Sequence, residues 1–453
     1  MPDRQPSFFF GWIVLIGLFG IMTLGSGFAF YSQGVFLDAL VREQGFSSGM
    51  AGAGTGVYFA ASGLGGYYTG GLINRFDVRW VMTVGAIAGG GGLALLGQIR
   101  APWQMFAVMI IFGAGYSLVG LVPCTTMIGR WFNRRRVIAM SIASTGLSLG
   151  GATVSPYIGR LIDQVSLEFW APQIGFWFVA ANLPLIWLAL RPWPHSVGQR
   201  PDGDPVDPTV TTEPGGAMAS APGVSFDEAR RSRYFKVMSV GFILVMGAQV
   251  GAIQHAFSLV RVRTDVATAV FILTLLPVIS VVFRIVGGIV ASKVGLSSLT
   301  RVLIGVQVFG IAILAVAETR LLFAIGVVIL GSAMGNLLML HPLLLTEAFG
   351  IRDYGRIYGL GSLLMIIGVA GGPLLVGVVK DLTDYRVAFI TITVVAALGG
   401  LVFMAAGSPP TPTPPPSKGP DDHATRNGQV SDHSIDLRPA TAPQVFDVAP
   451  APV

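Results

Sequence analysis

Twelve stretches of mostly apolar residues follow one another along the chain, separated by charged residues or by proline and glycine. A helix of about 20 apolar residues is long enough to cross a ~30 Å hydrocarbon layer, and each stretch is close to that length or longer. The stretches lie at residues 11–39, 48–73, 80–98, 103–129, 137–162, 173–190, 235–260, 266–291, 299–317, 321–345, 357–379 and 386–406. The sequence therefore predicts an all-α integral membrane protein with twelve transmembrane helices.

The composition excludes a series of soluble domains. Charged residues make up 11% of the chain and hydrophobic residues 53%, whereas a soluble domain carries roughly 25% charged residues. The net charge of +6 comes from Lys and Arg in the short gaps between apolar stretches. This placement indicates membrane topology and argues against a nucleic-acid-binding face. Cys124 is the single cysteine, which excludes an intramolecular disulfide and a cysteine-based zinc cluster.

Two segments are polar enough to interrupt the membrane part of the chain. One follows the sixth apolar stretch, and the other is a proline-rich tail that opens after Gly407. Their composition predicts that both lack a fold of their own. The resulting organisation is a six-helix half at residues 1–191, a central loop at 192–233, a second six-helix half at 234–406 and a disordered tail at 407–453.

The distribution of basic residues predicts the orientation of the chain. Before the tail, 17 Lys and Arg residues lie on one side of the predicted membrane and 8 on the other. Cytoplasmic loops carry the excess of such residues, so we expect both termini and the central loop in the cytoplasm. The first apolar stretch exceeds the roughly 7–15 residues of a signal-peptide core, and we interpret it as the first membrane helix. The lack of a long targeting extension favours a bacterial inner membrane.

An internal repeat relates the two halves. Two independent features recur at offsets of 217 and 218 residues, which indicates a duplicated six-helix unit. Such repeats build transporters whose substrate site lies near the midplane, between the halves. The paired residues are Gly70, Asn74 and Arg75 with Gly288, Ser292 and Lys293, and Pro156 and Asp163 with Pro373 and Asp381.

The loop after the second stretch has the pattern Gly-x-x-x-Asn-Arg-x-Asp-x-Arg, formed by Gly70, Asn74, Arg75, Asp77 and Arg79. It resembles the Gly-x-x-x-Asp-Arg-x-Gly-x-Arg loop between helices 2 and 3 of the major facilitator superfamily, and Asn at the Asp position is typical of monocarboxylate porters. Residues 123–151 resemble the helix 4 to helix 5 segment of the monocarboxylate-porter and oxalate/formate-exchanger branch. The resemblance covers about residues 8–405 and implies a twelve-helix secondary transporter.

The same loop and its repeat contain candidate gating residues. Fixed cations in a short loop can hold helix ends together through charge-assisted hydrogen bonds and the helix dipole, and such a latch must open when the halves move. The alternative is a purely topological role. The candidates are Asn74, Arg75, Arg79, Ser292 and Lys293.

Arg284 lies near the middle of the eighth apolar stretch. An unpaired cation there costs about 3 kcal/mol or more, so we expect it to face a partner or an aqueous cavity. Its planar guanidinium matches a carboxylate, and the resembling family uses an Arg at this place for the substrate carboxylate. The alternative is an Arg bonded to carbonyls of neighbouring helices.

Further polar residues inside the apolar stretches could line a substrate site, because buried amides and hydroxyls need partners. Tyr31, Gln254 and Asn336 are the candidates. Animal monocarboxylate porters usually carry an Asp one turn before the Arg and a Lys in helix 1, where this chain has Ser280 and Ser32. Proton coupling would therefore fall to His255 or His341, which can titrate near neutrality.

These features predict a secondary active transporter of a small organic anion, in the first place a monocarboxylate. The open alternatives are efflux of an amphipathic compound and a transporter-like membrane sensor. We expect no enzyme activity, because the two membrane histidines stand apart from any nucleophile or metal-ligand cluster. The expected partners are the anion, the lipid bilayer and a proton or counter-anion, with no cofactor, metal or nucleic acid.

Overall fold

The computed structural model describes residues 8–203, 223–291, 293–350 and 352–407, so the predicted tail at 407–453 lies outside the described residues except for Gly407. Eleven helical segments in this part of the chain are long and apolar enough to span a membrane, and α3, whose sequence is rich in glycine, adds a twelfth. The predicted all-α membrane fold with twelve helices is confirmed.

The helices of the first half are α1 (Gly11–Gly25), α2 (Gln33–Gln44), α3 (Ser48–Arg75), α4 (Val78–Leu95), α5 (Pro102–Val119), α6 (Leu121–Trp131), α7 (Arg136–Gln164) and α8 (Leu167–Pro184). After the short helix α9 (Phe226–Arg231), the second half contains α10 (Arg233–Arg263), α11 (Val266–Ala291), α12 (Leu296–Val316), α13 (Arg320–Phe349), α14 (Tyr354–Leu382) and α15 (Tyr385–Ala405).

Two predicted helices are interrupted in mid-span, and the sixth passes near its end from α8 into a π-helical segment, Leu185–Ala189. The first is continuous from Gly11 to Gln44, but a π-helical segment, Ser26–Tyr31, separates α1 from α2. The fourth breaks at Gly120, where the backbone leaves the helical region between α5 and α6. Interruptions of this kind change which carbonyls and side chains point inward, and they often occur at functional sites.

The prediction of an unstructured central loop is wrong for its two described ends. Pro194–Val197 and Pro201–Gly203 form short 3₁₀ turns, and α9 lies just before α10. The Asp202 carboxylate accepts hydrogen bonds from the backbone N–H groups of Asn133 and Arg134, at distances of 2.8 and 2.7 Å. The composition of the loop gives no sign of these contacts, because they depend on backbone groups of the distant α6–α7 connection.

Polar residues between the apolar stretches start several helices. At α3, the Ser47 side chain accepts from the backbone N–H of Met50, and Ser232, Thr319 and Asp384 cap α10, α13 and α15 in the same way. These caps satisfy backbone donors that the first helical turn leaves unpaired. They explain why helices joined by very short connections begin where they do.

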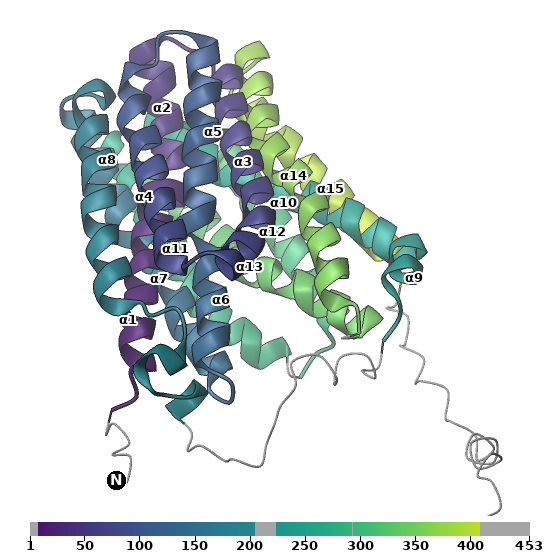
Figure 1. Ribbon diagram of the computed structural model, residues 1–453. Coiled ribbons are helices and arrows are strands. Elements are labelled where there is room, and N and C mark those ends of the chain that lie inside the picture. Colours follow the sequence, from purple (N-terminus) through teal and green to yellow (C-terminus); the bar gives the residue numbers. More distant parts are fainter. Residues whose placement is uncertain (1–7, 204–222, 292, 351, 408–453) are drawn as a thin grey trace, which may run out of the picture. The chain divides into compact units, whose positions relative to one another are not determined.

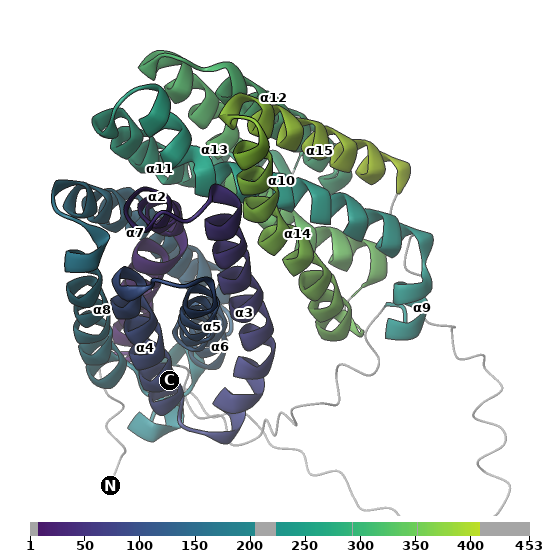
Figure 2. The same ribbon diagram turned by 90° about the horizontal axis from the view of Figure 1, so that it is seen from above.

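The two halves repeat one packing scheme. In the first half α1 packs on α7, α3 and α4 pack on α5, and α4 packs on α8. In the second half α10 packs on α14, α11 and α12 pack on α13, and α12 packs on α15. The halves meet through α3 with α14, α7 with α11 and α2 with α10 (Figure 2). The predicted six-helix repeat is therefore present in the structure.

The bundle has two different ends (Figure 1). We call the end with the start of α1, with α9 and with the last turn of α15 the loop end. The opposite end, with the α2–α3 connection and the last turn of α14, we call the clasped end.

A core of buried apolar side chains is shared by the halves toward the clasped end, where Phe36 of α2 belongs to the same cluster as Phe257 of α10 and Phe389 of α15. A separate cluster around Phe242 and Phe349 is confined to the second half, toward the loop end.

Large apolar side chains cover the outside of the bundle. Ile16 is 69% exposed, Trp177 60% and Phe309 61%. An apolar surface of this kind suits lipid and would be unfavourable in water. The chain is a multi-pass integral membrane protein.

Candidate functional site

Arg284 lies on α11, one turn after Ser280, and its side chain is partly buried. Its Nε atom is buried without a hydrogen-bond partner among the described atoms, and so is the hydroxyl of Ser280. Of the described titratable side chains, only Tyr31, from the first half, has an electrostatic interaction with the guanidinium. In the described part of the chain, no carboxylate neutralises this cation inside the apolar helix.

Tyr31, from the other half of the protein, lies within electrostatic range of Arg284. It ends the π-helical segment between α1 and α2, and it is 6% exposed. Phe30 packs edge-on against its ring at 5.0 Å. The Tyr31 ring lies so close to Gly151 of α7 that a Cβ there would approach a ring carbon to 2.5 Å. The π segment and this glycine together set the position of the ring beside the cation.

Two more tyrosines and an amide stand near Tyr31 on the side of the first half. Tyr116 lies near Tyr31, and its ring stacks on that of Tyr58 with the centroids 6.0 Å apart. Tyr58 and Gln33 are both fully buried and lie within interaction distance of each other, and apart from this contact neither the Tyr58 hydroxyl nor the Gln33 amide has a partner among the described atoms. Unpaired buried polar groups are costly, so these side chains are candidates for binding a polar ligand.

The side-chain amides of Gln254 and Asn336, both predicted site residues, each donate a hydrogen bond to the backbone next to Tyr31 or Arg284. Gln254 of α10 donates to the carbonyl of Phe30 at 3.4 Å, and its Oε1 is buried without a partner. Asn336 of α13 donates to the carbonyls of Phe283 and Ser332, at 2.9 and 3.1 Å. The structure thus places Gln254 beside the residue before Tyr31 and Asn336 beside the residue before Arg284, and the role of all four in substrate binding stays a prediction.

The two predicted proton-coupling candidates lie in different surroundings. His255 is fully buried on α10, and its Nε2 is 2.9 Å from the carbonyl of Pro373 on α14. His341 on α13 is 1% exposed and packs against Phe242, with ring centroids 4.9 Å apart. Both nitrogens of His341 lack a hydrogen-bond partner in the described structure. His255 follows Gln254 directly, whereas His341 packs against Phe242 of the apolar cluster toward the loop end.

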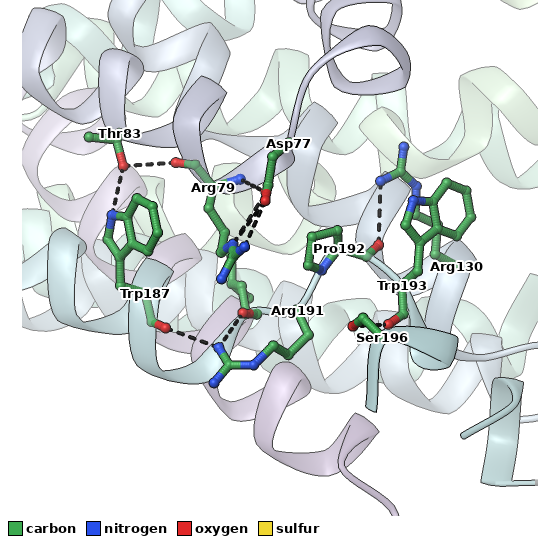
Figure 3. A network of polar contacts seen from close by, with 10 residues as sticks. Asp77, Arg79, Thr83, Arg130, Trp187, Arg191, Pro192, Trp193 and Ser196 are labelled. Atoms are coloured by element: carbon green, nitrogen blue, oxygen red, sulfur yellow. Dashed lines mark hydrogen bonds and ion pairs between the residues drawn. The ribbon is translucent and has the colours of Figure 1, made fainter. Parts of the chain in front are cut away.

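Two of the predicted gating residues of the first half, Asn74 and Arg79, bond within that half, and Figure 3 shows the surroundings of Arg79. Arg79 pairs with Asp77 at 2.7 Å and lies over the ring of Trp187, which belongs to the π-helical continuation of α8. Arg130 of α6 donates to the side chain of Asn74 at 3.1 Å. These contacts fasten the ends of α3, α4, α6 and α8 to one another, so the first half can move as one body.

Two further gating candidates, Arg75 and Lys293, have no such contacts within the described residues. Arg75 and Lys293 are exposed, and neither side chain has a hydrogen bond or ion pair in the described part of the chain. Ser292 lies outside the described residues. The gating role of all five residues stays a prediction.

Replacing Asp77 by Asn should lower the stability of the protein by about 1 kcal/mol at neutral pH, because Asn can still cap α4 but cannot pair with Arg79. Partial burial opposes the ionisation of Asp77, but the hydrogen bonds from the Arg79 side chain and backbone outweigh it and lower the pKa of this carboxyl below its ordinary 3.8. The pairing therefore contributes fully above pH 3.8 and is lost as the pH falls through the lower pKa of the folded state.

Thermal unfolding of the detergent-solubilised wild type and Asp77→Asn between pH 3 and pH 8 checks this expectation. The difference in melting temperature should stay constant above about pH 5 and shrink in acid. A difference that grows in acid would contradict the assignment. Asp227→Asn is the matched control, because Asp227 pairs with Arg230 at 2.7 Å in a more exposed setting.

A set of charged residues at the clasped end was missed by the sequence-based site prediction. Arg261 of α10 binds Asp38 of α2 at 2.6 Å and Asp163 of α7 at 3.0 Å. Asp381 of α14 accepts from the backbone N–H groups of Ser48 and Gly49, at 2.9 and 2.6 Å. Both sets of contacts join the two halves, and together we call them the clasp.

The internal repeat carried a signal for the clasp. Asp163 and Asp381 are equivalent in the repeat, and each binds the opposite half. The repeat indicates a duplication, but the sequence alone does not show that both carboxylates join the halves at the clasped end.

The profile of the Major Facilitator Superfamily matches residues 19–340 and 301–446. The chain belongs to this superfamily. The expected resemblance is thereby confirmed, and the fold and the contact between halves described above are those of a superfamily member.

Several known proteins are similar to this superfamily member. Monocarboxylate transporter 1 of Bos taurus is 30% identical over 156 residues, which cover 32% of this chain and 29% of that protein. The chain thus spans less than a third of that relative. Monocarboxylate transporter 11 of Mus musculus is 25% identical over 423 residues and 89% of each protein. The agnestins efflux protein AgnL12 of Paecilomyces divaricatus is 28% identical over 183 residues, or 40% of this chain and 41% of that protein.

Among solved structures, a bacterial homologue of the human lysosomal transporter Spinster, in an inward-facing and unoccupied conformation, has a TM-score of 0.68 at 15% identity. The similarity covers 88% of this chain and 97% of that one. At this level of identity the likeness supports the fold alone.

Proposed function

We propose that this protein is a secondary active transporter that moves a small organic anion, a monocarboxylate in the first place, by alternating access. Arg284 binds the carboxylate, and Tyr31, Gln254 and Asn336 complete the site. Asn336 acts through its hydrogen bond to the carbonyl of Phe283, which orients the turn that carries Arg284. The family and its monocarboxylate-transporting relatives support the proposal.

The observation that carries the proposal is the uncompensated charge of Arg284. A guanidinium inside an apolar helix is costly unless a partner balances it, and the described residues offer it Tyr31 and no carboxylate. A substrate carboxylate supplies both the missing charge and a planar pair of acceptors. Since Arg284 and Tyr31 come from different halves, a bound anion touches both moving parts.

The conformational cycle follows from the two ends of the bundle. The clasp joins the halves at one end, while the polar loop from Asn74 to Arg79 is bonded within the first half at the other. Opening of the clasp alternates with closure at the loop end, which involves the gating candidates. We place the loop end in the cytoplasm of a bacterial inner membrane, on the basis of the asymmetry of Lys and Arg.

Counterflow in proteoliposomes tests the proposed function. Vesicles containing the purified protein and an unlabelled carboxylate should take up the same labelled carboxylate, and vesicles with the corresponding amide or alcohol should not. A panel of monocarboxylates and dicarboxylates separates the two classes. Uptake of neutral analogues as fast as of the acids, or no carboxylate uptake at all, would overturn the anion proposal.

Two alternatives have different predicted results in the same assay. Efflux of an amphipathic compound, which the similarity to an efflux protein favours, requires no carboxylate on the substrate. A membrane sensor would bind a ligand without counterflow. An imposed pH gradient then distinguishes a proton, carried by His255 or His341, from a counter-anion as the coupling partner.

A further inference from the structure

A groove runs between α10 and α14 at the loop end of the second half. Its volume is about 490 Å³. The lining residues come from α9, α10 and α14 and are Arg230, Arg231, Phe235, Lys236, Ser239, Val240, Ile243, Leu360 and Leu364. The groove is separate from Arg284 and Tyr31, and the proposed transport mechanism does not use it.

Three cations line the groove, and two of them lack a partner among the described residues. Arg230 pairs with Asp227 at 2.7 Å. The Arg231 and Lys236 side chains have no hydrogen bond or ion pair with any described residue, and both are exposed. Two cations at one rim are therefore available for an external anion.

Along α10 from Lys236 to Ile243 the lining changes from charged to apolar. Ser239 is 3% exposed, and its buried hydroxyl has no partner among the described atoms. Beyond it lie Val240, which is 47% exposed, and Ile243. With a rise of about 1.5 Å per residue, the wall from Lys236 to Ile243 extends roughly 10 Å along α10.

We propose that this groove binds one anionic phospholipid. The phosphate lies between Arg231 and Lys236, the Ser239 hydroxyl donates to a headgroup or ester oxygen, and an acyl chain follows Val240, Ile243 and Leu364. Basic pockets between membrane helices on the cytoplasmic side are suited to such headgroups. A soluble phosphate would leave the apolar wall and its exposed valine uncovered.

A second groove at the same end provides a comparison. It lies between α12 and α15, has a volume of about 300 Å³ and is apolar except for Arg301. Arg301 donates to the Ser298 hydroxyl at 3.0 Å. With one engaged cation and no unpaired buried hydroxyl among its lining residues, it lacks the features that select an anionic headgroup.

Native mass spectrometry of the full-length protein tests the proposal. Wild type is mixed with dioleoyl phosphatidylglycerol or dioleoyl phosphatidylcholine, which share acyl chains and differ in net charge. We expect one phosphatidylglycerol to be retained at lipid concentrations where phosphatidylcholine is not. The double variant Arg231→Gln/Lys236→Gln should bind it about thirty-fold more weakly, and Ser239→Ala several-fold more weakly. The control Arg301→Gln/Arg352→Gln removes two cations from the same end and should bind as wild type does.

Three results would overturn the proposal. They are equal retention of both lipids by wild type, equal weakening by the control variant, and displacement of the lipid by soluble glycerol phosphate, which would indicate a free-anion site.

A second measurement does not depend on variants. Phosphatidylglycerol with a photoreactive acyl chain should label wild-type peptides containing Val240 and Leu364. Labelling confined to other helices would exclude this groove.

Discussion

Arg284→Ala should reduce carboxylate counterflow on the order of 100-fold, because about 3 kcal/mol of charge-assisted hydrogen bonding to the substrate is lost. Arg284→Lys should retain part of the activity, since it keeps the charge but lacks the planar pair of donors. Initial rates in proteoliposomes at low substrate concentration measure both effects. The loss of transport rate should occur for every transported carboxylate, regardless of the structure of the remainder of the substrate.

Arg386→Ala is the matched control for this experiment. Arg386 binds Glu318 at 2.8 Å in an exposed pair within the second half, with side chains 52% and 61% exposed. Its removal should leave transport close to wild type, provided that both variants elute as folded protein. Normal transport by Arg284→Ala would disprove the role of Arg284 as anion anchor and would favour efflux of an amphipathic compound.

Arg261→Gln should shift the protein away from the clasped conformation. Arg261 holds two carboxylates of the other half, and its side chain is 18% exposed. An ion pair of this partial burial stabilises more than an exposed pair and less than a fully buried one. We therefore expect the clasped conformation to lose about 2 kcal/mol of stability, which lowers the ratio of clasped to open protein roughly thirty-fold.

Spin labels at Val165→Cys and Leu321→Cys can report the shift. Both sites are exposed near the clasped end, one in each half, while the native Cys124 is buried. The fraction of long distances between the labels should rise in Arg261→Gln. Asp38→Asn should have a smaller effect and Asp163→Asn the smallest, because Asp163 forms the longer and more exposed contact. Arg386→Gln should leave the distances unchanged, and an equal shift in that control would contradict the clasp.

The succession of apolar stretches was enough to predict the twelve helices, because hydrophobic length alone decides whether a segment can span a bilayer. The π segment before Tyr31 and the break at Gly120 could not be predicted. Hydropathy is the same in α, π and broken helices, and the interruptions depend on contacts with distant helices, such as the hydrogen bond from Ser26 to the carbonyl of Leu147.

The same physical argument explains which candidate residues could be found from the sequence. Arg284 stands out because a charge is costly in the middle of an apolar helix. Asp38 and Arg261 lie near helix ends, where charged residues are common, so composition does not distinguish them from ordinary surface charges. Their importance follows only from the opposite half, which brings them within 2.6 Å of each other.

The two sets of contacts in the clasp, around Arg261 and around Asp381, differ in their sensitivity to substitution. The Arg261 side depends on three side chains, and a substitution of any one of them removes a contact. The Asp381 side depends mainly on the Asp381 side chain, since its donors at Ser48 and Gly49 belong to the backbone and, among the described residues of the opposite half, only Ser47 adds a side-chain interaction. Every residue except proline presents such an N–H group. Mutational drift can therefore adjust how readily this end opens through the side chains of Asp38, Asp163 and Arg261, whereas on the Asp381 side positions 48 and 49 act through their backbone and are constrained by packing, because Ser48 is buried and a Cβ at Gly49 would lie 3.1 Å from the Asp381 carboxylate.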